Sequence, residues 1–104
     1  MSIIDNLNAM LDKGQDNPLL RYSLGNEYFK QGEWDAAIEH LARAIELDAG
    51  YSAAWKIYGK ALAEAGQHAE AANTLEQGIG VAERKGDVQA AKEMRVFLKR
   101  LQTN

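Results

Sequence analysis

The apolar residues of the chain recur with the spacing of amphipathic helices, and this pattern itself repeats after 34 residues. The segment 24–44 reads LGNEYFKQGEWDAAIEHLARA, and it returns as segment 58–78, which reads YGKALAEAGQHAEAANTLEQG. Identities at small or apolar positions fix the alignment: Gly25/Gly59, Gly32/Gly66, Ala37/Ala71, Leu41/Leu75 and Ile45/Ile79. The pattern predicts an all-α chain of stacked, antiparallel helix-turn-helix units that share a shape and differ in surface chemistry.

Capping residues, one proline and several glycines mark where the predicted helices begin and end. Ser2 is a suitable N-cap for the first helix and Gly14 a suitable stop. Asn17 followed by Pro18 starts the second helix, because proline fits the first helical position. From these signals and the apolar stripes, the later helices cover about 18–31, 34–48, 52–65, 68–85 and 88–102.

Two kinds of glycine position are predicted within each unit. Gly25 lies beside the apolar stripe of its helix, and we expect it to face Ala37, so that the two helices approach closely. Gly32 and Gly66 suit the left-handed turn that ends a helix, a conformation that other residues adopt only at a cost. We expect a large side chain at Gly25, or any side chain at the turn glycines, to destabilise the fold.

A chain of 104 residues is expected to form one domain. Leu7 lies 34 residues before Leu41, so the first helix matches the second half of an incomplete unit. We therefore divide the chain into these parts: an N-terminal capping helix at 1–16, full units at 17–51 and 52–86, and a C-terminal capping helix at 87–104.

The alignment of the last helix needs one extra residue. A strict offset of 34 would put Gln89, Lys92 and Glu93 at core positions, and buried unpaired charge is costly. An offset of 35 instead aligns Phe97 with Leu62, so we prefer 35.

Composition narrows the function classes. The net charge of −3 gives no reason to expect nucleic acid as a partner, and no apolar run approaches the roughly 20 residues that cross a membrane. Cysteine is absent, which excludes disulfides and zinc-thiolate sites and is compatible with a cytoplasmic location. His40 is expected on an outer face, and His68 is expected to pack where Trp34 stands in the first unit. Neither lies in a metal-binding or catalytic motif, so we expect no metal, no cofactor and no enzyme activity.

The repeated pattern resembles the tetratricopeptide repeat family. The matching residues are Leu24, Gly25, Tyr28, Gly32, Trp34, Ala37, Leu41 and Ala44 in the first unit, and Trp55, Gly59, Leu62, Gly66, Ala71 and Leu75 in the second. The resemblance implies a short right-handed α-solenoid in which the first helix of each unit lines a concave groove. It also implies a non-catalytic protein-protein interaction module, such as an adaptor or co-chaperone-like protein, that binds a peptide segment of a partner.

The candidate site follows from the groove that the resemblance implies. The residues expected on its inner faces are Tyr22, Asn26, Phe29 and Lys30 on the first groove helix, Lys56, Lys60 and Glu64 on the second, and, with the offset of 35, Arg95 on the last. We expect an extended peptide with an acidic group or a free C-terminus, because the aromatic rings offer apolar contact and the lysines can meet carboxylates.

A second function class stays open. The last helix has no following helix to cover its outer side, where Val96, Leu98 and Leu101 lie. The chain would then be a structural subunit that self-associates or docks into a larger assembly through this helix. Its partner is in either case a protein or peptide, and the chain itself is expected to be a monomer or a weak homo-oligomer.

Overall fold

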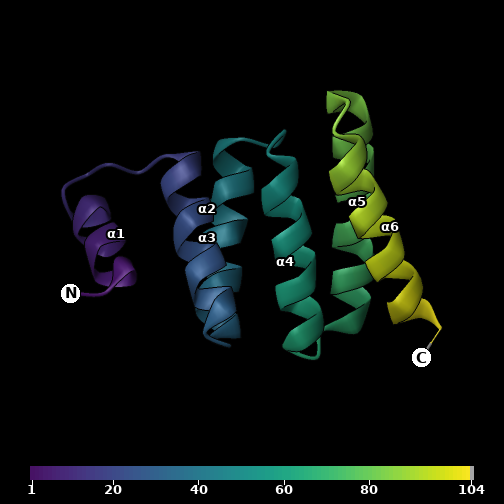
Figure 1. Cartoon of the computed structure of the whole chain (residues 1–104), viewed down its shortest axis with the longest axis horizontal. Coiled ribbons are helices and arrows are strands. Elements are labelled where there is room, and N and C mark those ends of the chain that lie inside the picture. Colours follow the sequence, from purple (N-terminus) through teal and green to yellow (C-terminus); the bar gives the residue numbers. More distant parts are fainter. Residues whose placement is uncertain (104) are drawn as a thin grey trace.

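The computed structural model describes residues 1–103, which form six helices and no strand. The helices are α1 (Ile3–Asp12), α2 (Pro18–Lys30), α3 (Trp34–Leu47), α4 (Ser52–Glu64), α5 (His68–Lys85) and α6 (Val88–Gln102). They stand side by side and follow one another along the longest axis of the molecule, from α1 at one end to α6 at the other (Figure 1). The predicted all-α helical-repeat fold is confirmed.

The caps predicted at Ser2 and Asn17 form, whereas α3, α4 and α5 begin without a side-chain cap. The Ser2 hydroxyl accepts a hydrogen bond from the Asp5 amide while the Asp5 carboxylate accepts one from the Ser2 amide, which completes a capping box. The Asn17 side chain accepts from the Leu20 amide at 2.8 Å and so begins α2. Positive φ angles end four of the helices, at the glycines Gly14, Gly32, Gly66 and Gly86. Gly50 is different, since it has no positive φ and α3 already ends at Leu47.

The helix pairs close on glycine, although the neighbour is not the one expected. A Cβ atom built on Gly25 would lie 2.5 Å from Cγ of Leu41, and one on Gly59 would lie 2.5 Å from Cδ2 of Leu75. The expected neighbour of Gly25, Ala37, is not among the nearest atoms. The reason is that the second helix of each unit places its large leucine, and not its small alanine, in the space that glycine leaves.

The offset of the last helix is larger than predicted. The N-cap residues are Asn17, Tyr51 and Asp87, so α4 begins 34 residues after α2, and α6 begins 36 residues after α4. Helix α5 has 18 residues where α3 has 14, and the turn before α6 has two residues where the turn before α4 has four. The predicted offset of 35 is therefore wrong by one residue, and this error changes which side of α6 each residue occupies.

Helix α6 buries only a few residues, most of them small. Ala90, Ala91 and Met94 are buried, whereas Phe97, Leu98 and Leu101 are only partly buried against them. Small residues play a similar part in α4, where Ala54, Ile57 and Ala61 join the core together with Leu62. The close packing of the stack thus depends on alanines that the large apolar stripes did not reveal.

Candidate functional site

The first helices of the units lie next to one another. Helix α4 contacts α2 on one side and α6 on the other, so these three helices share one face of the stack. We call this surface the groove face. All but one of the predicted site residues lie on or beside it, and their surroundings divide the face into an aromatic part at α2 and a cationic part at α4 and α6.

The aromatic part is held by ring contacts. Tyr22 stacks on Tyr51 with ring centroids 5.0 Å apart, and Phe29 lies 5.4 Å from the ring of Trp34. Both predicted contact rings therefore also pack on the core, and they are partly buried. Asn26 lies one turn after Tyr22 and one turn before the end of α2, partly exposed between the two rings. The rings are fixed in place before any ligand arrives, which lowers the entropy cost of using them in binding.

The charged residues at the ends of α2 and α4 are more exposed. Lys30 forms an ion pair with Glu27 one turn earlier, with Nζ 3.1 Å from Oε2. Glu64 is the last residue of α4 and is exposed. Both lie at the edge of the groove face, where water screens a charge strongly.

Lys56 already forms an ion pair with a residue of α6. Its Nζ lies 2.6 Å from Oε2 of Glu93 on α6, and Gln89 donates to the other carboxylate oxygen at 3.1 Å. The hydrogen bond from Lys56, followed by that from Gln89, holds the pKa of the Glu93 carboxyl below its usual value. Lys56 therefore joins α4 to α6 and is less available to a ligand than the sequence suggested.

Lys60 keeps its charge near an aromatic ring. Its Nζ lies 5.7 Å from the centroid of Phe97, within the range of a cation-π contact. Beside this pair lies a pocket of about 250 Å³ between α4 and α6. Its lining includes Lys60, Lys92, Glu93, Val96, Phe97 and Arg100.

Arg95 does not belong to this group. Its guanidinium forms an ion pair with Glu83 on α5, and it lies beside Val88 and Ala91 on the side of α6 away from Lys60. The prediction that placed Arg95 in the groove is wrong, because it used the offset of 35. With the observed offset of 36, Lys92 is equivalent to Lys56 and Val96 is equivalent to Lys60.

The pocket residues Lys92, Val96, Phe97 and Arg100 are the ones that the sequence analysis missed as binding residues. A signal for them was available. Gly86 followed by Asp87 marks the start of α6, and counting forward from that cap gives the correct faces. The large apolar residues alone pointed to a different alignment because Phe97 is only partly buried.

The two histidines also differ from expectation. His68 is exposed at the first position of α5 and does not replace the packing of Trp34. His40 is half-buried between α2 and α3, stacked on Tyr28 with centroids 5.6 Å apart. Arg21 Nη1 lies 3.0 Å from His40 Nδ1, which makes this ring nitrogen the acceptor.

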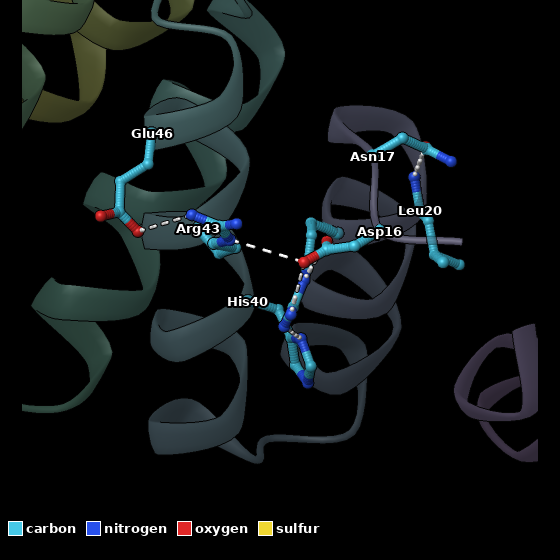
Figure 2. Close-up of polar contacts among 7 residues, drawn as sticks. Asp16, Asn17, Leu20, His40, Arg43 and Glu46 are labelled. Carbon is cyan, nitrogen blue, oxygen red and sulfur yellow. Dashed lines mark hydrogen bonds and ion pairs between the residues drawn. The ribbon is translucent and has the colours of Figure 1, made fainter. Parts of the chain in front are cut away.

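His40 belongs to a polar cluster that joins the α1–α2 loop to the first helix pair (Figure 2). Arg21 donates to both oxygens of Asp16, at 2.7 and 3.1 Å, and Arg43 lies 3.6 Å from the same carboxylate. The hydrogen bond from Arg21 lowers the pKa of Asp16. Burial, and then the Arg21 charge, lower the pKa of His40. The short, satisfied contacts indicate a structural cluster that fixes the loop.

Residues 1–103 contain no cluster of His, Cys, Asp and Glu side chains with the arrangement of a metal site. Within the same range, none of the helices combines the length and the apolar character that a membrane crossing requires.

Comparison with known proteins gives a consistent result. A family model described as tetratricopeptide repeat matches residues 22–80, which is more than half of the chain. The TPR repeat-containing protein PA0015 of Pseudomonas aeruginosa (strain PAO1) is 50% identical over 99 residues, which span 95% of this chain and 94% of that protein.

Solved structures agree with the fold. The solution structure of protein BPP2914 from Bordetella parapertussis superposes with a TM-score of 0.88 and 44% identity, covering 99% of this chain and 90% of that one. A tetratricopeptide repeat domain protein from Salinibacter ruber has a TM-score of 0.78 and 24% identity, covering 85% of this chain and 98% of its own. The second likeness supports the fold alone.

Proposed function

The chain belongs to the tetratricopeptide repeat family, and we propose that it is a non-catalytic module whose groove face binds a peptide segment of a partner protein. Domains of this family are generally protein-protein interaction modules. The adaptor role, the site and the peptide ligand are our proposal for this chain. A cytoplasmic location is part of it, and the absence of cysteine is compatible with this location.

One observation carries the proposal. The pocket between α4 and α6 combines a partly buried aromatic ring with basic side chains on the face that α2, α4 and α6 share. Binding sites for peptides need apolar contact area together with a few placed polar groups. The aromatic part at α2 belongs to the same face and offers further apolar contact area through Tyr22 and Phe29.

The residues that hold the fold together differ from those offered for binding. Leu24, Leu41, Leu62 and Leu75 are fully buried, while Asn26, Lys60 and Val96 have exposed surface. Substitutions on the groove face can therefore change binding without removing core packing. Affinity is expected to be modest, since one short groove must also compensate for the ordering of the peptide.

A matched pair of charge changes tests the proposal. Peptides selected from a random displayed library on the wild-type protein are titrated against Lys60→Glu, which lies on the groove face, and Lys13→Glu, which makes the same change at an exposed position after α1. We expect Lys60→Glu to weaken binding and Lys13→Glu to leave it unchanged. Equal binding to both variants would mean that the groove face is not the site.

Docking through α6 is the second candidate. Val88 at the start of α6 is 76% exposed, and Leu98 and Leu101 of the same helix are only partly buried, so α6 leaves apolar surface uncovered. Light scattering over a range of concentrations tests this function. A monomer at every concentration would argue against self-association through α6.

A further inference from the structure

We propose that the pocket between α4 and α6 selects an internal, extended peptide segment in which two acidic residues flank one apolar residue, spaced acidic-x-apolar-x-acidic. The inference rests on the proposed function and names the class of peptide that the site takes. Its basis is the order of side chains along α6, where a basic, an apolar and a basic residue follow one another on the side that lines the pocket.

The pocket carries an excess of positive charge. Lys60, Lys92 and Arg100 line it, and none of them forms an ion pair with another side chain in the part of the chain that the structure describes. Its acidic residue, Glu93, is already paired with Lys56 at 2.6 Å. A segment with carboxylate side chains therefore complements the pocket although the whole chain has a net charge of −3.

The spacing of the two outer basic residues suggests the spacing of the carboxylates. Lys92 and Arg100 are eight residues apart on one helix, which at a rise of 1.5 Å separates their backbone positions by about 12 Å. An extended peptide advances about 3.3 Å per residue, so four steps span about 13 Å. Residues one and five of such a segment point to the same side, because side chains alternate along an extended chain.

The centre of the segment meets an apolar surface. Val96 lies midway between Lys92 and Arg100 and is 46% exposed, and Phe97 lies beside it under the Lys60 ammonium group. The third residue of the peptide points to the same side as residues one and five, so it faces Val96. Burial of an apolar side chain there is favourable, whereas a polar one would lose water without gaining a partner.

The same spacing argues against a single C-terminal carboxylate as the main ligand. Across backbone positions about 12 Å apart, one carboxylate could meet Lys92 and Arg100 together only if both side chains bent towards each other along the helix. An internal segment supplies two carboxylates at the required separation and needs no chain end. The proposal is therefore committed to acidic side chains, and a free C-terminus is an alternative that the experiment can detect.

The experiment selects 12-residue peptides from a random displayed library on the wild-type protein, with the peptides fused at both ends so that none has a free C-terminus. Enriched peptides are then synthesised with capped ends and titrated by fluorescence polarisation. We expect enrichment of the acidic-x-apolar-x-acidic spacing, and binding at least about tenfold weaker when both acidic residues become amides. Raising salt from about 0.05 M to about 0.5 M should weaken binding further.

A matched pair of variants locates the site. Lys92→Ser/Arg100→Ser removes two charges that line the pocket, and Arg84→Ser/Lys99→Ser removes the same two charge types from exposed positions outside it. We expect the first to weaken binding at least about tenfold and the second to change it less than about twofold. Unfolding measurements on both variants confirm that each is folded.

The possible results separate this inference from the proposed function. Selected peptides that respond to Lys60→Glu but lack the acidic spacing, or that bind only with a free C-terminus, would overturn the inference and leave the proposed function standing. Failure to select any peptide whose binding responds to the groove variants would overturn both.

Discussion

The α2–α3 and α4–α5 crossings and the α5–α6 crossing place glycine on different helices of the unit. Gly25 and Gly59 lie on α2 and α4, the first helices of their units, and leave the space into which Leu41 and Leu75 of the following helix fit. Where α5 meets α6, the glycine lies on the second helix of its unit. A Cβ built on Gly78 would lie 2.7 Å from the sulfur of Met94, which enters from α6.

The position of α6 that is equivalent to Gly25 and Gly59 carries a different residue. Gly25, Gly59 and Arg95 each lie eight residues after the N-cap of their helix, at Asn17, Tyr51 and Asp87. The position that receives a leucine in α2 and α4 is thus occupied in α6 by an arginine, whose side chain is 51% exposed and paired with Glu83. A further helix that packed on α6 as α3 packs on α2 would have to displace the Arg95 side chain from its pair with Glu83. The position that admits a leucine in α2 and α4 therefore carries a bulky charged side chain in α6.

Among the changes that test this comparison, replacing the leucines should have the largest effect on stability. Leu41→Ala and Leu75→Ala are each expected to lower the free energy of unfolding by about 2–5 kcal/mol, since both side chains are fully buried. Urea unfolding followed by circular dichroism measures the change. A loss below about 0.5 kcal/mol in both variants would show that these residues do not hold the crossings.

Filling the glycine positions should have the next largest effect. Gly25→Ala and Gly59→Ala place a methyl group against a buried leucine and are expected to cost roughly 1–3 kcal/mol by overpacking. Gly80→Ala is the control in α5, where the nearest atom to a new Cβ is the flexible end of Arg84 at 3.4 Å. It should stabilise by roughly 0.5–1 kcal/mol through helix propensity, so the sign of the same substitution reverses.

The pH dependence of stability should distinguish the α2–α3 crossing from the others, with a smaller effect than the substitutions above. His40 lies at the α2–α3 crossing and faces Arg21 and Tyr28 from α2, Asp16 from the loop, and Glu39 on its own helix. Its pKa is lowered from 6.5, so the unfolded chain binds this proton more readily than the native one. Stability that is complete above the unfolded pKa is therefore lost as the pH falls below it.

The measurement compares urea midpoints between about pH 7.5 and 5.5 in wild type, His40→Gln and His68→Gln. Wild type and His68→Gln should lose stability over this range, and His40→Gln should lose less. Identical pH dependence in all three proteins would show that His40 has no part in it.

Arg95→Ala should have the smallest effect. This variant places alanine at the position of α6 that is equivalent to Gly25 and Gly59. It removes only an exposed ion pair, so we expect stability to change by less than about 0.5 kcal/mol. Urea unfolding of Gly25→Ala, Gly59→Ala and Arg95→Ala side by side gives the comparison directly. A loss above about 1 kcal/mol for Arg95→Ala would mean that this residue holds α6 in place.

Much of the fold could be predicted from the sequence, because a residue type that recurs at the same position of both units has the same structural role in each. Gly32 and Gly66 adopt the predicted positive φ, and Asn17 caps α2 as predicted. The neighbour of Gly25 was not available, since a glycine indicates that something comes close without indicating which side chain does so. Leu41 and Ala37 lie one turn apart on the same face, and only the packing decides between them.

The candidate site was predicted less well, for a physical reason that concerns turns. Apolar spacing defines a face within one helix, but the offset between helices depends on helix length and on the number of turn residues. The longer α5 and the two-residue turn before Val88 moved Arg95 off the groove face and moved Lys92 onto it. The pairing of Lys56 with Glu93 depends on the same offset and was missed with it.

The two units differ at the residue by which each one packs on the preceding helix. Leu20 is buried against Ile4 of α1, whereas its equivalent in the next unit, Ala54, is buried in the cluster that contains Ala44 of α3. A gene duplication that copied the first unit behind itself would place Leu20 in the cluster of Ala44, where Ala54 now supplies a methyl group. The two units thus differ at this junction, and we expect a lengthened descendant of this chain to pack its new junction better with Leu20→Ala in the inserted copy.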